Sequence, residues 1–203
     1  MGTRKLDKSW ARRTVGSGRK KSDRVKSLDG YGSPREAFDA LIEDGREKFP
    51  KRIWEPAAGR HHMVRAMERH GHRVFTSDVY AWSKKTRKIV DFLRTKRAPK
   101  KYECIVTNPP FYLAQDFASH AMTVLPEGGT LYLLLRVQWL EGVKRKRELF
   151  DSTPPKFVYV FSYRLPMMHA FEHKGKKVKG GMMAMAWFVF QKGFTGETRV
   201  RWL

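Results

Sequence analysis

Apolar residues along the chain form two alternating kinds of pattern between residues 51 and 150. Short, nearly continuous apolar runs are typical of buried strands, and they occur at residues 51–55, 72–79, 102–107 and 130–140. Between them lie segments with an apolar residue every three or four positions, which favour helices; these are residues 61–71, 113–129 and 141–150. The exception is residues 84–101, a strongly basic segment around a small apolar centre.

A further helix is predicted ahead of the first strand. Its apolar residues share one face and are Phe38, Leu41 and Ile42. Ser33, Pro34 and Glu36 have the spacing of a helix N-terminus with a capping box.

The end of the chain has a different pattern. Residues 156–164 and 184–193 read as two further strands, joined by a link that is long for a hairpin, residues 165–183. Alternating strands and helices followed by a strand pair predict an α/β fold with a doubly wound, mostly parallel sheet and an antiparallel C-terminal edge strand.

Ligands of such sheets bind beyond the carboxyl ends of the strands. Three unusual segments follow predicted strands at that edge: Glu-Pro-Ala-Ala-Gly at 55–59, Ser-Asp-Val at 77–79 and Thr-Asn-Pro-Pro-Phe-Tyr at 107–112. The sequence therefore predicts a site formed by these three segments together.

The charge of the chain indicates a polyanionic partner. The 203 residues include 42 Lys and Arg against 20 Asp and Glu, a formal net charge of +22. Residues 1–29 read as a basic arm that is mobile until it meets a partner, and residues 30–203 as one domain that remains strongly basic. The alternative reading of the charge is solubility alone. Basic clusters within the domain lie at 84–88, 94–101, 144–147 and 174–179.

Several classes of protein are disfavoured by the sequence. Cys104 is the single cysteine, which excludes an internal disulfide, and its apolar neighbours predict a buried thiol. The adjacent His61 and His62 lack a third ligand, so no metal site is expected. The chain has neither an apolar run of about 18 residues for a membrane span nor the apolar core of a secretory signal. We expect a cytoplasmic protein that does not bind membranes.

The segment Thr107–Tyr112 carries the most specific chemistry. Two prolines end a strand, because proline lacks a backbone N–H and fixes its own φ, so a simple strand terminator is one interpretation. The other is a rigid pair of hydrogen-bond acceptors, the Asn108 amide oxygen and the Pro109 carbonyl, beside the aromatic ring of Phe111. Such acceptors suit an exocyclic amino group, whose lone pair they localise.

Together these segments resemble the S-adenosylmethionine-dependent amino-methyltransferases of the N6-adenine DNA type, and the small phage and prophage forms look closest. The resemblance runs from about residue 31 to the C-terminus and implies a Rossmann-like methyltransferase sheet. In that family the Asn-Pro-Pro-aromatic turn holds the target amino group, and the aromatic ring stacks on the target base. The catalytic residues implied here are Asn108, Pro109, Pro110 and Phe111.

The resemblance also implies S-adenosylmethionine as the cofactor and a set of residues to bind it. Glu-Pro-Ala-Ala-Gly resembles the family's small-residue cofactor loop, with the difference that Arg60, His61 and His62 stand where a second glycine is usual. Asp78 fits a contact to the ribose, and Asp91 a contact to the adenine. The full implied set is Tyr31, Ser33, Pro34, Glu55, Pro56, Ala57, Gly59, Asp78, Val79, Asp91, Phe92 and Asn108. Each segment has a purely structural alternative: a strand–helix turn, a capping aspartate or a capping box.

The substrate is predicted from charge together with the resemblance. Residues expected to contact it are Phe111, Tyr112, Trp139, Tyr163 and Arg164. Related turns methylate adenine N6 in DNA, adenine N6 or guanine N2 in RNA, and glutamine amides in release factors. A surface of charge +22 favours nucleic acid. We expect DNA as the partner, with RNA as the alternative, and a non-catalytic nucleic-acid-binding protein as a third interpretation.

Overall fold

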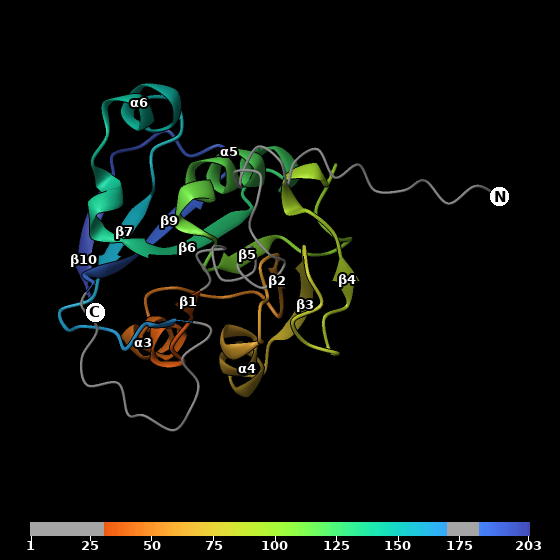
Figure 1. Ribbon diagram of the computed structural model, residues 1–203. Coiled ribbons are helices and arrows are strands. Elements are labelled where there is room, and N and C mark those ends of the chain that lie inside the picture. Colours follow the sequence, from red (N-terminus) through yellow and green to blue (C-terminus); the bar gives the residue numbers. More distant parts are fainter. Residues whose placement is uncertain (1–30, 170–182) are drawn as a thin grey trace, which may run out of the picture.

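The computed structural model describes residues 31–169 and 183–203. The predicted basic arm and most of the 165–183 link fall outside these ranges. The described residues build an eight-stranded sheet in the order β10-β7-β9-β6-β5-β2-β3-β4 (Figure 1). Its strands are β2 (Arg52–Glu55), β3 (Arg73–Asp78), β4 (Lys88–Ile89), β5 (Cys104–Thr107), β6 (Thr130–Arg136), β7 (Phe157–Val160), β9 (Met185–Gln191) and β10 (Arg199–Trp202).

The predicted doubly wound, mostly parallel sheet is confirmed. Every pair of neighbouring strands is parallel except the two pairs that contain β9. The antiparallel strand predicted near the C-terminus is therefore present, but it lies inside the sheet between β6 and β7, and β10 forms the edge. Residues 185–190 of β9 are all buried, as an interior strand requires, whereas β10 is mostly exposed.

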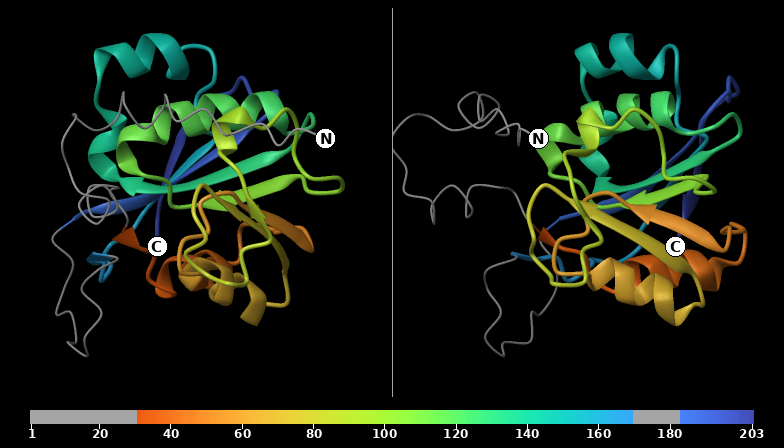
Figure 2. Two further views of the ribbon diagram at one scale, coloured as in Figure 1. Left: turned by 45° about the vertical axis from the view of Figure 1, so that its right-hand side comes forward. Right: turned by 90° about the vertical axis from the view of Figure 1, so that its right-hand side faces the viewer.

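Two helical layers cover the faces of the sheet. Helices α3 (Glu36–Asp44) and α4 (His62–Arg69) pack on one face, and α5 (Ala114–Val124) packs on the other. Figures 1 and 2 show these layers below and above the sheet. The Trp187 indole of β9 joins the sheet to α3 by donating to the Ala37 carbonyl at 2.7 Å.

Shorter elements complete the α5 side and the strand ends. They are the turns η1 (Phe92–Arg94), η2 (Phe111–Leu113) and η3 (Val137–Leu140), the helix α6 (Val143–Arg145), and η4 (Lys146–Phe150), a π-helical turn. A separate two-stranded pairing joins β1 (Tyr31–Gly32) to β8 (Met168–His169). The expected helix at 141–150 is thus split between α6 and η4.

The predicted capping box at the start of α3 is wrong. The N-cap position is Arg35, and no side chain caps the helix. Backbone carbonyls satisfy the first turn instead, because the Ala37 and Phe38 N–H groups donate to Pro34 and Arg35, each at 3.2 Å. Ser33 is therefore available for another role.

Candidate functional site

Three loops meet at the carboxyl edge of the sheet because the strands before them are parallel neighbours. β2 pairs with β3 on one side, with Glu55 opposite Thr76, and with β5 on the other, with Trp54 opposite Ile105. The segments 55–59, 77–79 and 107–112 therefore lie together, as the strand order predicted.

Glu55 orders the loop after β2, beside the end of β5. Its Oε1 accepts the Ala57 N–H at 2.9 Å, and its carboxyl group is buried. Burial raises the pKa of Glu55 to about 8, against the lowering effect of the nearby Thr107 side chain and the Ala57 N–H hydrogen bond. The buried Thr107 side chain lies near this carboxyl group and directly precedes Asn108, so two of the three predicted site segments meet here.

Asp78, at the end of β3, fastens the same loop from the other side. Its Oδ2 accepts the Gly59 N–H at 2.9 Å, while its Oδ1 accepts the Tyr80 N–H at 3.0 Å and the Trp82 indole N–H at 3.2 Å. Only 6% of the residue is exposed, and burial raises its pKa while these hydrogen bonds lower it. Both oxygens are engaged within the protein, so the geometry gives Asp78 the task of ordering the loop.

His61 is one of the three residues, 60–62, that stand where the resemblance led us to expect a second glycine. Its φ of 65° lies in the left-handed region that a glycine adopts without cost. Its imidazole is buried, with Nε2 at 3.1 Å from the Thr86 hydroxyl in the loop between β3 and β4. Burial is the largest influence on the His61 pKa and lowers it, which favours the neutral ring. The side chain thereby joins two loops that a glycine would leave unconnected.

The turn Thr107–Tyr112 places its residues as a strand end requires. Asn108 is half-buried and Pro109 is buried. Pro110 caps η2, with its carbonyl accepting the Leu113 N–H at 2.9 Å, and α5 follows immediately. The rigid turn is therefore held between a core strand and a helix.

Phe111 has a partner that the sequence did not indicate to us. The guanidinium carbon of Arg136 lies 4.8 Å from the centre of the Phe111 ring, within the range of a cation–π interaction. Arg136 ends β6, and it is the only charged residue in an otherwise apolar strand. A lone charge at the carboxyl end of a central strand is the signal that could have identified it.

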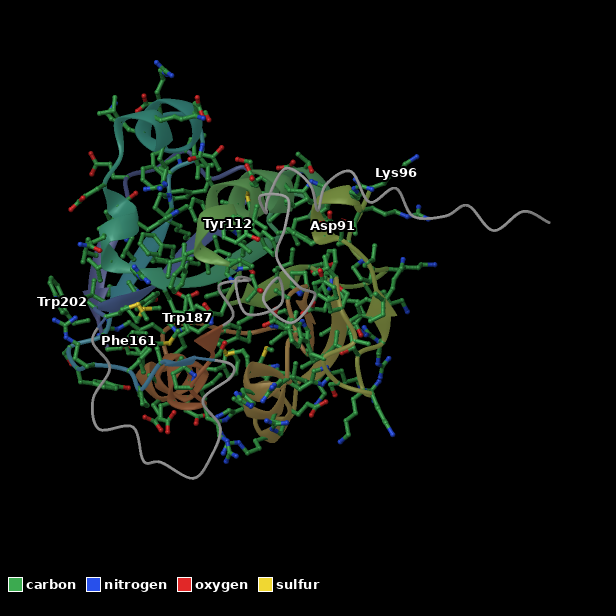
Figure 3. The ribbon with its side chains drawn as sticks, in the orientation of Figure 1. Asp91, Lys96, Tyr112, Phe161, Trp187 and Trp202 are labelled. Atoms are coloured by element: carbon green, nitrogen blue, oxygen red, sulfur yellow. The ribbon has the colours of Figure 1, made fainter. Side chains whose placement is uncertain are left out.

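The remaining predicted residues divide between the strand edge and the core. Asp91 is half-buried, caps η1 through its Oδ1, and lies with the exposed Tyr112 on the α5 side of the sheet (Figure 3). Phe92 is buried, with its ring centre 5.2 Å from that of Trp54 and 4.7 Å from that of Phe117. Phe92 therefore packs beneath Asp91.

Trp139, predicted to contact the substrate, belongs to the core. Only 8% of it is exposed, its ring packs edge-on against Phe150 and Phe188, and the Arg145 guanidinium covers it at 4.7 Å. The geometry gives this tryptophan a packing role, because the residues of α6 and η4 fold back over it.

The other predicted substrate residues remain at the surface. Tyr163 and Arg164 are exposed just after β7, and the Tyr163 ring lies 5.6 Å from that of Phe161. Among the residues predicted to bind the cofactor, Ser33 is half-buried, Pro34 and Pro56 are buried, and Val79 is exposed. The backbone of Tyr31 pairs with that of His169 in β8.

Other chemical sites are not found among the described residues. Residues 31–169 and 183–203 contain no group of three His, Cys, Asp or Glu side chains suited to a metal ion. Cys104 is buried, as predicted, and burial raises its thiol pKa to about 12. In the same ranges, every helix is too short or too polar to cross a membrane.

No protein-family model and no curated protein matches the sequence. Solved structures do match the fold. TrmN from Thermus thermophilus is 20% identical over 76% of this chain and 47% of its own, with a TM-score of 0.50. A modification subunit of a putative type I restriction enzyme from Vibrio vulnificus is 14% identical over 90% of this chain and 52% of its own, with a TM-score of 0.56.

A putative RNA methyltransferase from Pyrococcus horikoshii is 16% identical, covers 92% of this chain and 98% of its own, and has a TM-score of 0.56. This chain thus spans about half the length of the first two proteins and is similar in extent to the third. The likeness establishes the Rossmann-like fold that methyltransferases use.

Proposed function

We propose that this protein transfers a methyl group from S-adenosylmethionine to the N6 amino group of adenine in DNA. The observation that carries the proposal is the position of Asn108 and Pro109. They follow the central strand β5 directly and stand beside the loop after β2, because β2 and β5 are parallel neighbours in the sheet. An acceptor pair at this edge suits an amino group brought next to a bound cofactor.

The acceptors would act on a nucleophile that is weak by itself. The lone pair of an exocyclic amine is delocalised into the aromatic ring, so the nitrogen attacks poorly. Hydrogen bonds from its two N–H groups to the Asn108 side chain and the Pro109 carbonyl favour the pyramidal nitrogen of the transition state. The two prolines and the start of η2 hold these acceptors in place, so little reorganisation is needed during the reaction.

The residues present fit the proposed cofactor, which when bound supplies an electrophilic methyl group. Ala57 and Gly59 are half-buried, and a Cβ added at Gly59 would meet no atom closer than 3.9 Å, so there is open space at this loop. We assign close van der Waals contact with the cofactor to the small residues 57–59, whose N–H groups already donate to Glu55, Ser77 and Asp78, and polar contact to the partly exposed carboxylate of Asp91. Glu55, Asp78 and His61 hold the loop in shape.

Phe111 offers the face on which the target base would stack. Its ring is half-buried at the end of the sheet, where it packs against buried residues from the cores on both faces of the sheet. The Arg136 guanidinium lies over the ring. Stacking on a fixed aromatic ring is how enzymes that modify bases hold a nucleotide taken out of its stack. The exposed Tyr112 and Tyr163 supply further rings at this surface.

The experiment that tests the proposal is transfer of a tritiated methyl group to duplex DNA, single-stranded DNA, tRNA and rRNA, followed by nucleoside analysis. We expect N6-methyladenine in DNA. Asn108→Ala should abolish transfer while calorimetry still detects cofactor binding. Label found only on protein would contradict the nucleic-acid substrate, and absence of cofactor binding would favour a non-catalytic binding protein.

RNA is the second candidate. A structural neighbour that covers 92% of this chain and 98% of its own is named a putative RNA methyltransferase. Label found in tRNA or rRNA, with none in DNA, would favour this reading and would leave the roles of Asn108 and Pro109 unchanged.

A further inference from the structure

A groove of about 800 Å³ lies on the α5 face of the sheet, over its β2–β3–β4 end. Trp54 of β2 and Phe75 of β3, which are paired in register, form part of its lining. One wall is the segment 94–100, and the far edge is β4. Five basic residues line it: Lys88, Arg94, Lys96, Arg97 and Lys100.

The groove exists because the connection between β4 and β5 is almost without a helix. Crossovers between parallel strands are usually helical and cover the face of the sheet, but here the only helical element is η1, three residues long. The rest runs as irregular chain, held by the Ala98 N–H, which donates to the Val124 carbonyl of α5 at 3.0 Å. The Phe75 ring in the groove lining packs against the Tyr102 ring, with centres 5.8 Å apart.

The charge of the groove is positive and largely uncompensated. All five basic side chains belong to exposed residues, and Lys96 extends into solvent in Figure 3. Within residues 31–169 and 183–203, Arg94 is the member with an ion pair, to Asp91 at 3.7 Å. None of the described residues that line the groove is acidic. Five cations along one open surface attract an extended polyanion more strongly than a single small anion.

We propose that this groove holds the sugar–phosphate backbone of the nucleic acid substrate, on a stretch of strand flanking the modified nucleotide. The inference rests on the proposed function, and the Arg94–Asp91 pair connects the groove to the edge where that function is placed. The basic arm does not suit this surface, since residues 1–29 carry ten Lys and Arg against three Asp and would be repelled.

The groove is suited to phosphates and not to reading bases. Trp54 is 1% exposed, and its indole N–H is bonded to the Ser77 hydroxyl at 2.9 Å, so its ring offers no stacking face. The exposed groups are ammonium and guanidinium ions, which contact phosphates irrespective of sequence. The groove should therefore contribute affinity and salt dependence, while sequence preference arises elsewhere.

The test compares two triple variants of the full chain that lose equal charge. The groove variant is Lys96→Ala, Arg97→Ala, Lys100→Ala. The control changes three exposed basic residues in the loop between α3 and β2, as Arg46→Ala, Lys48→Ala, Lys51→Ala. Binding of a fluorescein-labelled DNA duplex is measured by anisotropy from about 50 to 200 mM salt, a range over which phosphate contacts change affinity strongly.

We expect the groove variant to bind at least tenfold more weakly than the control at low salt. The slope of log affinity against log salt should become shallower by about 0.9 for each phosphate that the variant no longer neutralises. A charge-retaining variant, Lys96→Arg, Arg97→Lys, Lys100→Arg, should restore both quantities. Equal affinities and slopes for the groove and control variants would overturn the proposal.

The outcomes separate this inference from the proposed function. If the wild-type protein transferred no methyl group but the groove variant alone lost DNA affinity, the groove would stand and the enzymatic proposal would fail. If methyl transfer occurred and all variants bound alike, the groove would fail alone. Unchanged cofactor affinity in calorimetry and matching thermal melting show that the variants are folded.

Discussion

Replacing Glu55 with glutamine should make the stability of the protein less dependent on pH. The buried carboxyl has its pKa raised from 4.5 to about 8. Between these values the folded state binds a proton that the unfolded state has released. Stability from this group is therefore complete below pH 4.5 and is lost as the pH rises towards 8. Glutamine cannot ionise, so the stability of Glu55→Gln does not fall in this way as the pH rises.

The size of the effect follows from the pKa shift. Each unit of pKa corresponds to 1.36 kcal/mol, so the shift of Glu55 corresponds to about 5 kcal/mol over the whole window. Between pH 5.5 and 8.5 the free energy of unfolding of Glu55→Gln, minus that of the wild type, should rise by about 3 kcal/mol. This is a large fraction of the stability of an ordinary domain, about 5–15 kcal/mol.

Urea unfolding at several pH values measures this difference directly. Subtracting the wild-type value at each pH cancels the titration of all other groups, and Glu103→Gln, at an exposed position, controls for the loss of one negative charge. A difference that stays flat across the window would show that the Glu55 carboxyl ionises freely in the folded protein. The burial of the Glu55 carboxyl group beneath the loop after β2 would then be contradicted.

Three further substitutions test particular contacts. Arg136→Ala should lower the rate of methyl transfer by about tenfold, since a cation–π contact is worth about 0.5–2 kcal/mol. Cofactor affinity should stay unchanged. An equal loss of transfer rate and of cofactor affinity would mean that Phe111 is not the group affected. Thr86→Val should lower the free energy of unfolding by about 1–2 kcal/mol, because it leaves the His61 ring without its partner. In a double-mutant cycle with His61→Ala, additive losses of this free energy would exclude the contact. Trp187→Phe removes the indole N–H bonded to α3 and should cost about 2–3 kcal/mol in urea unfolding; a destabilisation below about 0.5 kcal/mol would contradict that role.

The strands along the chain and the meeting of the three loops at one edge of the sheet could be predicted because both depend on local pattern. Continuous apolar runs mark β2, β3, β5 and β6, and parallel strands bring the segments that follow them to one edge. The position of β9 depends instead on pairing with β6, about 50 residues earlier in the chain, which no local pattern encodes. Its continuous apolar run, however, was a usable sign of an interior strand.

Individual side chains were harder to predict wherever their roles depend on packing. Trp139 looked like a substrate contact because its segment follows a central strand, yet α6 and η4 bury it. Asp78 stands where an acid was expected, but the nearby N–H groups of Gly59 and Trp82 engage both of its oxygens. The groove could not be predicted, because it results from a helix that the basic segment does not form.

The central claim is that Asn108 and Pro109 hold an amino group for methyl transfer. Its most direct test is single-turnover transfer of tritiated methyl to adenine-containing DNA by the wild type and by Asn108→Ala, with cofactor affinity measured on both. We predict N6-methyladenine with the wild type and a decrease of at least about a hundredfold in rate for the variant, about 2.7 kcal/mol, at unchanged cofactor affinity. Transfer by Asn108→Ala at the wild-type rate would contradict the claim.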